Sequence, residues 1–79
     1  MKKWIIKRHG SNAANQSMRQ SMVMGTVAAE DSRGAKEVAA EIWTCYNNQY
    51  FEAIDLDGRT RKADREAAFT ADAYRVETR

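Results

Sequence analysis

Apolar residues fall into short stretches along the chain, and the spacing within each stretch predicts a secondary structure. In KWIIKRH (residues 3–9) apolar side chains occupy both alternating faces, as in a central strand covered on both sides. Apolar and small residues alternate in SMVMGTVAA (21–29), with Met22, Met24 and Thr26 expected on one face, and again in YFEAIDL (50–56). Three strands are therefore predicted, with a loop over residues 12–18 between the first two.

The clearest helical spacing extends from about residue 33 to residue 46. Asp31 or Ser32 can cap its first turn, and Asn47 and Asn48 suit its C-terminal end. The predicted buried stripe has the i, i+3, i+4, i+7 rhythm of an amphipathic helix and consists of Ala35, Val38, Ala39, Ile42 and Tyr46. We expect this helix to pack on the sheet.

A second helix is predicted over about residues 62–76, after the turn signal Asp57-Gly58. Its expected packing stripe comprises Ala63, Ala67, Ala71 and Tyr74. A stripe that is mostly alanine buries little apolar area. Residues 57–79 are therefore expected to be loosely packed or to depend on a partner.

The order of elements, β-β-α-β followed by a helix, predicts one small α+β domain covering residues 1–79. There is no proline, internal repeat or Gly/Ser linker to mark a boundary. A right-handed crossover from the second strand to the third makes those two strands parallel and leaves the first strand between them. The first helix covers one face of this three-stranded sheet, and the tail, a second subunit or a target covers the other.

Composition fits a folded chain with a thin core. Hydrophobic residues make up 43% of the 79 positions and charged residues 30%, too apolar a balance for a disordered protein. The single Cys45 rules out an internal disulfide, fits a reducing compartment and is expected to be a small buried residue. No apolar run reaches the roughly 20 residues of a membrane span. A soluble, cytoplasmic protein is expected.

Charge is segregated along the chain, and this is the strongest functional hint in the sequence. Residues 1–29 contain no acidic residue and five bases, Lys2, Lys3, Lys7, Arg8 and Arg19. Residues 30–56 contain six acids and two bases, whereas the remaining segment is nearly balanced, with six bases and five acids. A basic N-terminal surface can steer association with an acidic protein or with phosphates.

Catalytic and metal-binding patterns are weak. His9 is the only histidine, and Cys45 near a helix C-terminus lacks the dipole that would lower its pKa. There is no Gly-rich phosphate loop and no G-x-S-x-G turn, and DLDGRT (55–60) lacks the later ligands of a calcium loop. We expect no enzymatic activity, no cofactor and no metal.

Two clusters of amide side chains leave two interpretations open. Asn12, Asn15 and Gln16 precede the second strand, and Asn47, Asn48 and Gln49 precede the third. They either satisfy backbone groups in irregular connections or meet at one end of the sheet as a neutral recognition patch. Trp43 is expected to be a core residue, because a thin core needs large side chains. Its position beside the helical stripe leaves open that it is an exposed anchor.

The first functional hypothesis is a non-enzymatic module that binds another protein, an inhibitor or adaptor of the kind that phages and mobile elements encode. The partner is expected to present an acidic surface. The expected binding residues are Lys3, Lys7, Arg8, Asn12, Asn15, Gln16, Arg19, Trp43 and Asn48. The alternative is RNA or DNA binding through the basic first strand, and a third hypothesis is a self-assembling subunit such as a homodimer.

Overall fold

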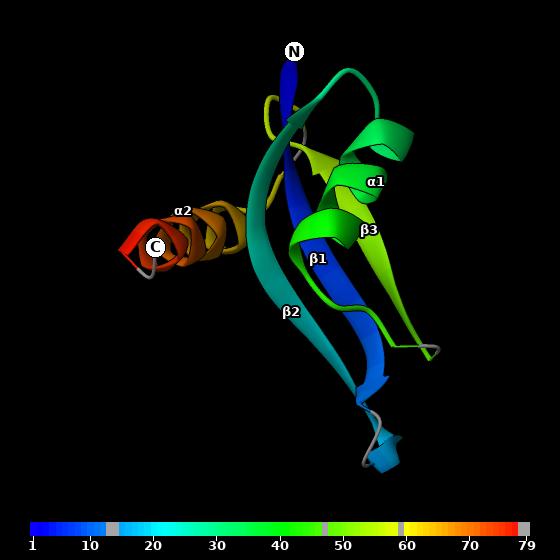
Figure 1. The fold of residues 1–79 in the computed structure, drawn as a ribbon. Helices are drawn as coiled ribbons and strands as arrows, with labels where there is room; N and C mark the ends of the chain where they lie inside the picture. Colours follow the sequence, from blue (N-terminus) through cyan, green and yellow to red (C-terminus); the bar gives the residue numbers. More distant parts are fainter. Residues whose placement is uncertain (13–14, 47, 59, 78–79) are drawn as a thin grey trace.

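The computed structural model describes residues 1–12, 15–46, 48–58 and 60–77, and the side chains of all of these except 11–20, 76 and 77. The elements of the described residues, drawn in Figure 1, are β1 (Lys2–Asn12), β2 (Asn15–Ala29), α1 (Ser32–Ile42), β3 (Gln49–Asp55) and α2 (Lys62–Glu77).

The three strands form one sheet in the order β2-β1-β3, with β1 antiparallel to both neighbours. The predicted α+β class, the β-β-α-β order and the central position of the first strand are confirmed. α1 lies over one face of the sheet, and α2 lies on the other side, mainly along β2 (Figure 1). The second predicted helix therefore supplies cover for the second face, but only near one edge.

The hairpin between β1 and β2 is longer than the sequence indicates. Strand pairing continues from Gly10 opposite Gln20 to Ser11 opposite Arg19, and β2 already begins at Asn15. The prediction of a loop over residues 12–18 is wrong because the backbone ladder continues through a mostly polar stretch that has no alternating apolar pattern to mark it.

A bulge in β2 changes which residues face each helix. Val23 pairs with Lys7 and Gly25 with Ile6, so Met24 is the extra residue between them. Gly25 has a φ of +148°, in the region that favours glycine. Met24 packs against the core under α1, whereas Thr26 contacts α2, so the expected common face for Met24 and Thr26 is wrong.

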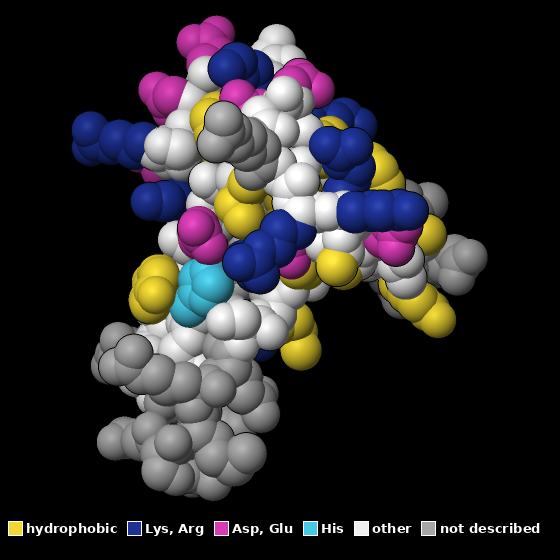
Figure 2. Space-filling model, turned by 180° about the vertical axis from the view of Figure 1, so that it is seen from behind, with side chains coloured by type: hydrophobic (Ala, Val, Ile, Leu, Met, Phe, Trp, Pro, Cys, Tyr) yellow, Lys and Arg dark blue, Asp and Glu magenta, His cyan; other side chains and the backbone are white. Residues whose placement is uncertain are grey.

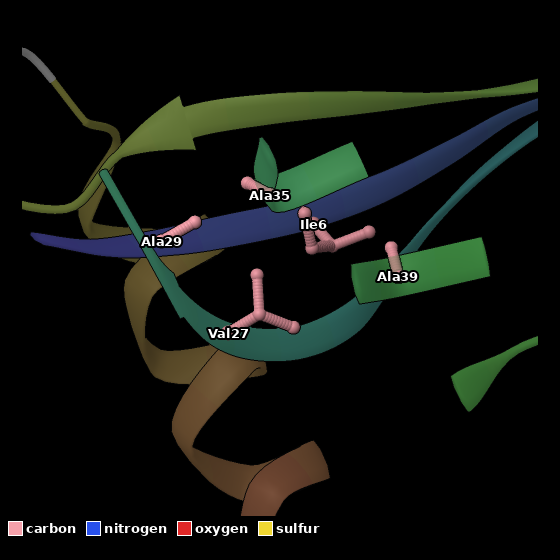
Figure 3. Close-up of a cluster of buried hydrophobic side chains, with 5 residues drawn as sticks. All are labelled: Ile6, Val27, Ala29, Ala35 and Ala39. Carbon is pink, nitrogen blue, oxygen red and sulfur yellow. The ribbon is translucent and has the colours of Figure 1, made fainter. Parts of the chain in front are cut away.

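The core under α1 is thin and built from small side chains. Figure 3 shows its members directed toward one another between α1 and the sheet: Ile6, Val27, Ala29, Ala35 and Ala39. Trp43 is half-buried and packs against this cluster, and its ring lies 5.2 Å from the Arg75 guanidinium. Trp43 is therefore part of the packing between elements, as expected for a core residue, and its role in partner binding stays a prediction.

α1 begins as expected and ends earlier. The Asp31 side chain accepts a hydrogen bond of 2.7 Å from the Gly34 backbone N–H, so Asp31, one of the two predicted capping residues, is the N-cap. The helix ends at Ile42 because Trp43 is extended and turns its ring to the sheet. Tyr46 and Asn48 consequently lie beyond the helix, Tyr46 is exposed, and Cys45 is exposed rather than buried; Asn47 lies outside the described residues.

Candidate functional site: the outer face of α2

The sheet-facing side of α2 is polar. Ala68 is fully buried, and the half-buried side chains beside it are Asp64, Ala71, Asp72 and Arg75. Ala63, Ala67 and Tyr74 are exposed instead. The predicted stripe therefore faces outward at three of its four positions, and the prediction that these residues form the packing side of α2 is wrong.

Two charged side chains of α2 hold Thr26 of β2 from outside the sheet. The Asp72 carboxylate accepts from the Thr26 backbone N–H at 2.8 Å and from its hydroxyl at 2.5 Å, and Arg75 donates to the Thr26 carbonyl at 3.2 Å. Both Thr26 backbone groups point away from β1. Asp72 and Arg75 thus occupy hydrogen-bonding positions that a further strand would use, and they block this edge of the sheet.

A second polar contact fixes the other half of α2. The Lys7 ammonium lies 3.5 Å from the Asp64 carboxylate, and both side chains are about four-fifths buried. An ion pair with this little solvent exposure is screened less than a surface pair. Because Asp64, Asp72 and Arg75 attach the helix, its apolar side chains on the opposite side are not needed for packing.

The outward side of α2 carries a shallow groove lined by Phe69, Thr70, Ala73 and Tyr74. The i, i+4 spacing of Phe69 with Ala73 and of Thr70 with Tyr74 places these residues side by side on the helix. Phe69 is 49% exposed and Tyr74 66%. Two aromatic rings therefore flank two smaller side chains on a surface that the described residues leave open.

Basic residues precede this groove at the start of α2. Arg61, Lys62 and Arg65 are exposed, and the exposed acids near them are Glu66, which lies 3.9 Å from Lys62, and Asp57 in the preceding turn. Asp64 and Asp72 are turned toward the sheet. The nearly balanced sequence of this segment therefore gives a surface with excess positive charge beside the groove.

The basic residues of the first strand do not form one positive face. Lys7 contacts α2, whereas Arg8 donates to the Thr44 carbonyl at 2.9 Å on the α1 side. Lys3 is exposed and shares the Lys7 face by strand alternation, and Lys2 pairs with Asp55 at 3.1 Å. Figure 2 shows basic and acidic side chains interspersed on the α2 side of the sheet. The expected basic strand surface is therefore split and partly neutralised.

The two amide-rich segments lie at the same end of the sheet (Figure 1). Gln49 is paired with Gly10, and Gly10 has a φ of +121° and no room for a Cβ because the Asn48 carbonyl oxygen lies against it. The side chains of Asn12, Asn15, Gln16 and Arg19 lie outside the described part of the chain. Their role in recognition stays a prediction.

A hydrogen-bonded chain crosses all three strands near this end. His9 Nδ1 lies 2.7 Å from Ser21 Oγ and His9 Nε2 lies 2.7 Å from Glu52 Oε1, with the Tyr50 ring 5.2 Å from the imidazole. The residue types match a hydrolytic relay, but that chemistry also needs preorganised oxyanion donors and a cleft that excludes water. The chain lies on an open strand surface (Figure 2), with Glu52 half exposed. We interpret it as a set of side-chain hydrogen bonds that links the three strands.

The described residues contain no group of three or more His, Cys, Asp or Glu side chains placed to hold a metal ion. None of the described helices has the length and apolar character needed to cross a membrane. Comparisons of the chain with protein-family models, with curated proteins and with solved structures found no match.

Sequence reasoning missed Phe69 and Tyr74 as surface residues. The signal that could have found them is the spacing of Asp64, Ala68, Asp72 and Arg75, which places three charged residues on one side of the helix. A charged stripe on a helix is normally predicted to face solvent. Here Asp64 pairs with Lys7 and Asp72 accepts from Thr26, so the stripe faces the sheet. Function is therefore to be sought on the apolar side of α2.

Proposed function

We propose that this protein is a non-enzymatic binding module whose α2 groove, lined by Phe69, Thr70, Ala73 and Tyr74, takes an apolar and acidic segment of a partner protein. The observation that carries the proposal is the attachment of α2 through polar contacts, which leaves two aromatic side chains about half exposed or more. Such a module would serve as an inhibitor or adaptor.

The groove has the composition of a binding hot spot. Covering a Phe or Tyr side chain contributes about 1.5–3 kcal/mol at full burial, and aromatic residues are enriched among residues that dominate interface energies. Ala73 and Thr70 are small enough to let a partner side chain enter between the rings. Most of the affinity would therefore come from Phe69 and Tyr74.

The partner's acidic character follows from the charge beside the groove. Arg61, Lys62 and Arg65 are exposed on one flank, and the carboxylates of Asp64 and Asp72 are engaged with the sheet. Complementary charge mainly raises the association rate and fixes orientation. An acidic residue next to apolar residues in the partner would match both parts of this surface.

Nucleic-acid binding through the first strand has less support. Lys7 is paired with Asp64, and Glu52 contributes a carboxylate to the same face through its bond to His9. A polyanion approaching this face would meet fixed negative charge near its phosphates. The test below includes nuclease treatment so that a nucleic-acid ligand would be detected.

The test compares proteins captured from the native host by the wild type and by two matched double variants. Phe69→Ser with Tyr74→Ser removes the groove, whereas Met22→Ser with Tyr46→Ser removes side chains of similar exposure elsewhere, 53% and 52%. A partner retained by the wild type and the control after nuclease treatment, and lost with the groove variant, supports the proposal. Equal capture by all three, or loss on nuclease treatment, contradicts it.

A further inference from the structure

The outer edge of β3 carries backbone groups without a strand partner. The Leu56 N–H donates to the Lys3 carbonyl at 3.1 Å, which fixes the alternation of the β1–β3 ladder. The backbone N–H and C=O groups of residues 50, 52 and 54 therefore bond to β1, whereas those of residues 49, 51, 53 and 55 point away from β1. The Gln49 N–H is satisfied by the Tyr46 carbonyl and the Asp55 carbonyl by the Gly58 N–H.

Between those two turns, the N–H and C=O groups of Phe51 and Ala53 have no partner among the described residues. The opposite edge of the sheet is treated differently, because Asp72 and Arg75 occupy the outward groups of Thr26. β3 forms a border of the sheet, and the part of the chain that the structure describes places no further strand beside it (Figure 1). An open edge of this kind is a template for pairing with another strand.

We propose that β3 pairs antiparallel with β3 of a second copy of this chain, centred on Phe51, to give a continuous six-stranded sheet. This register places Phe51 opposite Phe51 of the second copy and Tyr50 opposite its Glu52. Four backbone hydrogen bonds form without disturbing the Gln49 turn: two between the Phe51 residues and two from the Ala53 N–H groups to the Gln49 carbonyls.

Charge and hydrogen bonding distinguish this register from its neighbours. Moving the pairing by one hydrogen-bonding step toward the C-terminus places Glu52 directly opposite Glu52, and like charges at that position are destabilising. A further step places Phe51 opposite Asp55. A step toward the N-terminus would place Tyr50 opposite Tyr50, but among the described residues it leaves two backbone hydrogen bonds instead of four, because the Gln49 N–H is already engaged by the Tyr46 carbonyl. The Phe51-centred arrangement pairs ring with ring, keeps four backbone bonds and leaves each Glu52 opposite an uncharged residue, Tyr50, which is 61% exposed.

The interface involves one short strand from each copy, so a reversible monomer–dimer equilibrium is expected rather than a permanent dimer. The α2 grooves lie along the β2 edges, at the far ends of the six-stranded sheet. The dimer would therefore present two grooves, although its formation does not depend on the proposed function of the groove.

Sedimentation equilibrium over a range of protein concentrations tests the inference with two opposite substitutions at one exposed position. Tyr50→Glu places a carboxylate opposite Glu52 and should weaken dimerisation, whereas Tyr50→Lys places a cation there and should strengthen it. Each dimer contains two such pairs, so the dissociation constant should change by about 2- to 30-fold in either direction. Tyr46→Glu is the control and should leave it unchanged.

A wild type that stays monomeric at every concentration would overturn the inference. So would a dimer whose dissociation constant ignores both Tyr50 variants, or one abolished by Phe69→Ser with Tyr74→Ser, because that dimer would form through α2. The last result would also show that the groove is a self-contact, whereas loss of the β3 dimer alone would leave the proposed function of the groove standing.

Discussion

Replacing Asp72 with Ala should release α2 from the sheet. The substitution removes the carboxylate that accepts from the Thr26 backbone N–H and hydroxyl, at 2.8 and 2.5 Å, and that lies 3.4 Å from Arg75. Thr26 is 6% exposed, so water cannot readily replace the lost acceptor. The variant therefore leaves two donors unsatisfied in a buried position.

The expected cost is about 2–4 kcal/mol of unfolding free energy. Hydrogen bonds to a charged group contribute roughly 1.5–3 kcal/mol each, about 3–6 kcal/mol for two, and this sum is reduced to about 2–4 kcal/mol because the Asp72 side chain is 23% exposed and partly solvated. In a domain of this size the melting temperature should fall by about 10–25 °C. Glu66→Ala on the outer side of α2 should change the unfolding free energy by less than about 0.5 kcal/mol.

Urea unfolding followed by circular dichroism measures these differences in unfolding free energy. A double-mutant cycle with Thr26→Val isolates the hydrogen bond between the Thr26 hydroxyl and the Asp72 carboxylate. The coupling between Asp72 and Thr26 should exceed about 1 kcal/mol. An Asp72→Ala variant as stable as Glu66→Ala, or additive effects of Asp72→Ala and Thr26→Val, would refute the polar attachment of α2.

Two further predictions concern the bulge and acid stability. Gly25→Ala should lower the unfolding free energy measured in urea by about 2 kcal/mol or more, because a Cβ would lie 2.6 Å from Asp72 Oδ1 and the φ of +148° disfavours a side chain. Gly34→Ala is the control and should be tolerated, because Gly34 has an ordinary helical φ. Equal stability of the two variants would contradict the bulge. The hydrogen bond from Lys2, and to a smaller extent the one from the Asp57 backbone N–H, lowers the pKa of Asp55 below its ordinary value of 3.8. The ionised Asp55 therefore stabilises the fold above pH 3.8, and this stabilisation is lost as the pH falls through the lowered pKa. Lys2→Ala should raise the pKa of Asp55 in an NMR titration, and an unchanged value would exclude the Lys2 contact in solution.

Much of the architecture followed from local patterns in the sequence. WII (4–6) has apolar residues on both faces, and Ile5 and Ile6 are both fully buried on opposite sides of the central strand. Ala35 and Ala39 follow helical spacing and are buried under α1. These positions are predictable because burial on both faces of a strand or along one stripe of a helix leaves a periodic signal.

Other features depend on contacts that no local pattern encodes. The bulge at Met24 reverses the alternation of β2, and only the pairing with β1 defines it. The sheet-facing side of α2 was misassigned because Asp64 and Asp72 find partners 57 and 46 residues away. The basic residues that are adjacent in the sequence of β1 are likewise divided between the two faces of the sheet, because successive residues of a strand face opposite sides.

Thiol labelling of neighbouring positions on α2 tests most directly the claim that this helix faces the sheet with its polar side. In a Cys45→Ser background, Ala67→Cys lies on the exposed side and Ala68→Cys on the fully buried side. We expect a thiol reagent to label position 67 rapidly and position 68 only as fast as the helix detaches or the protein unfolds. Rapid labelling at 68 with protection at 67 would place the alanine stripe against the sheet and contradict the account.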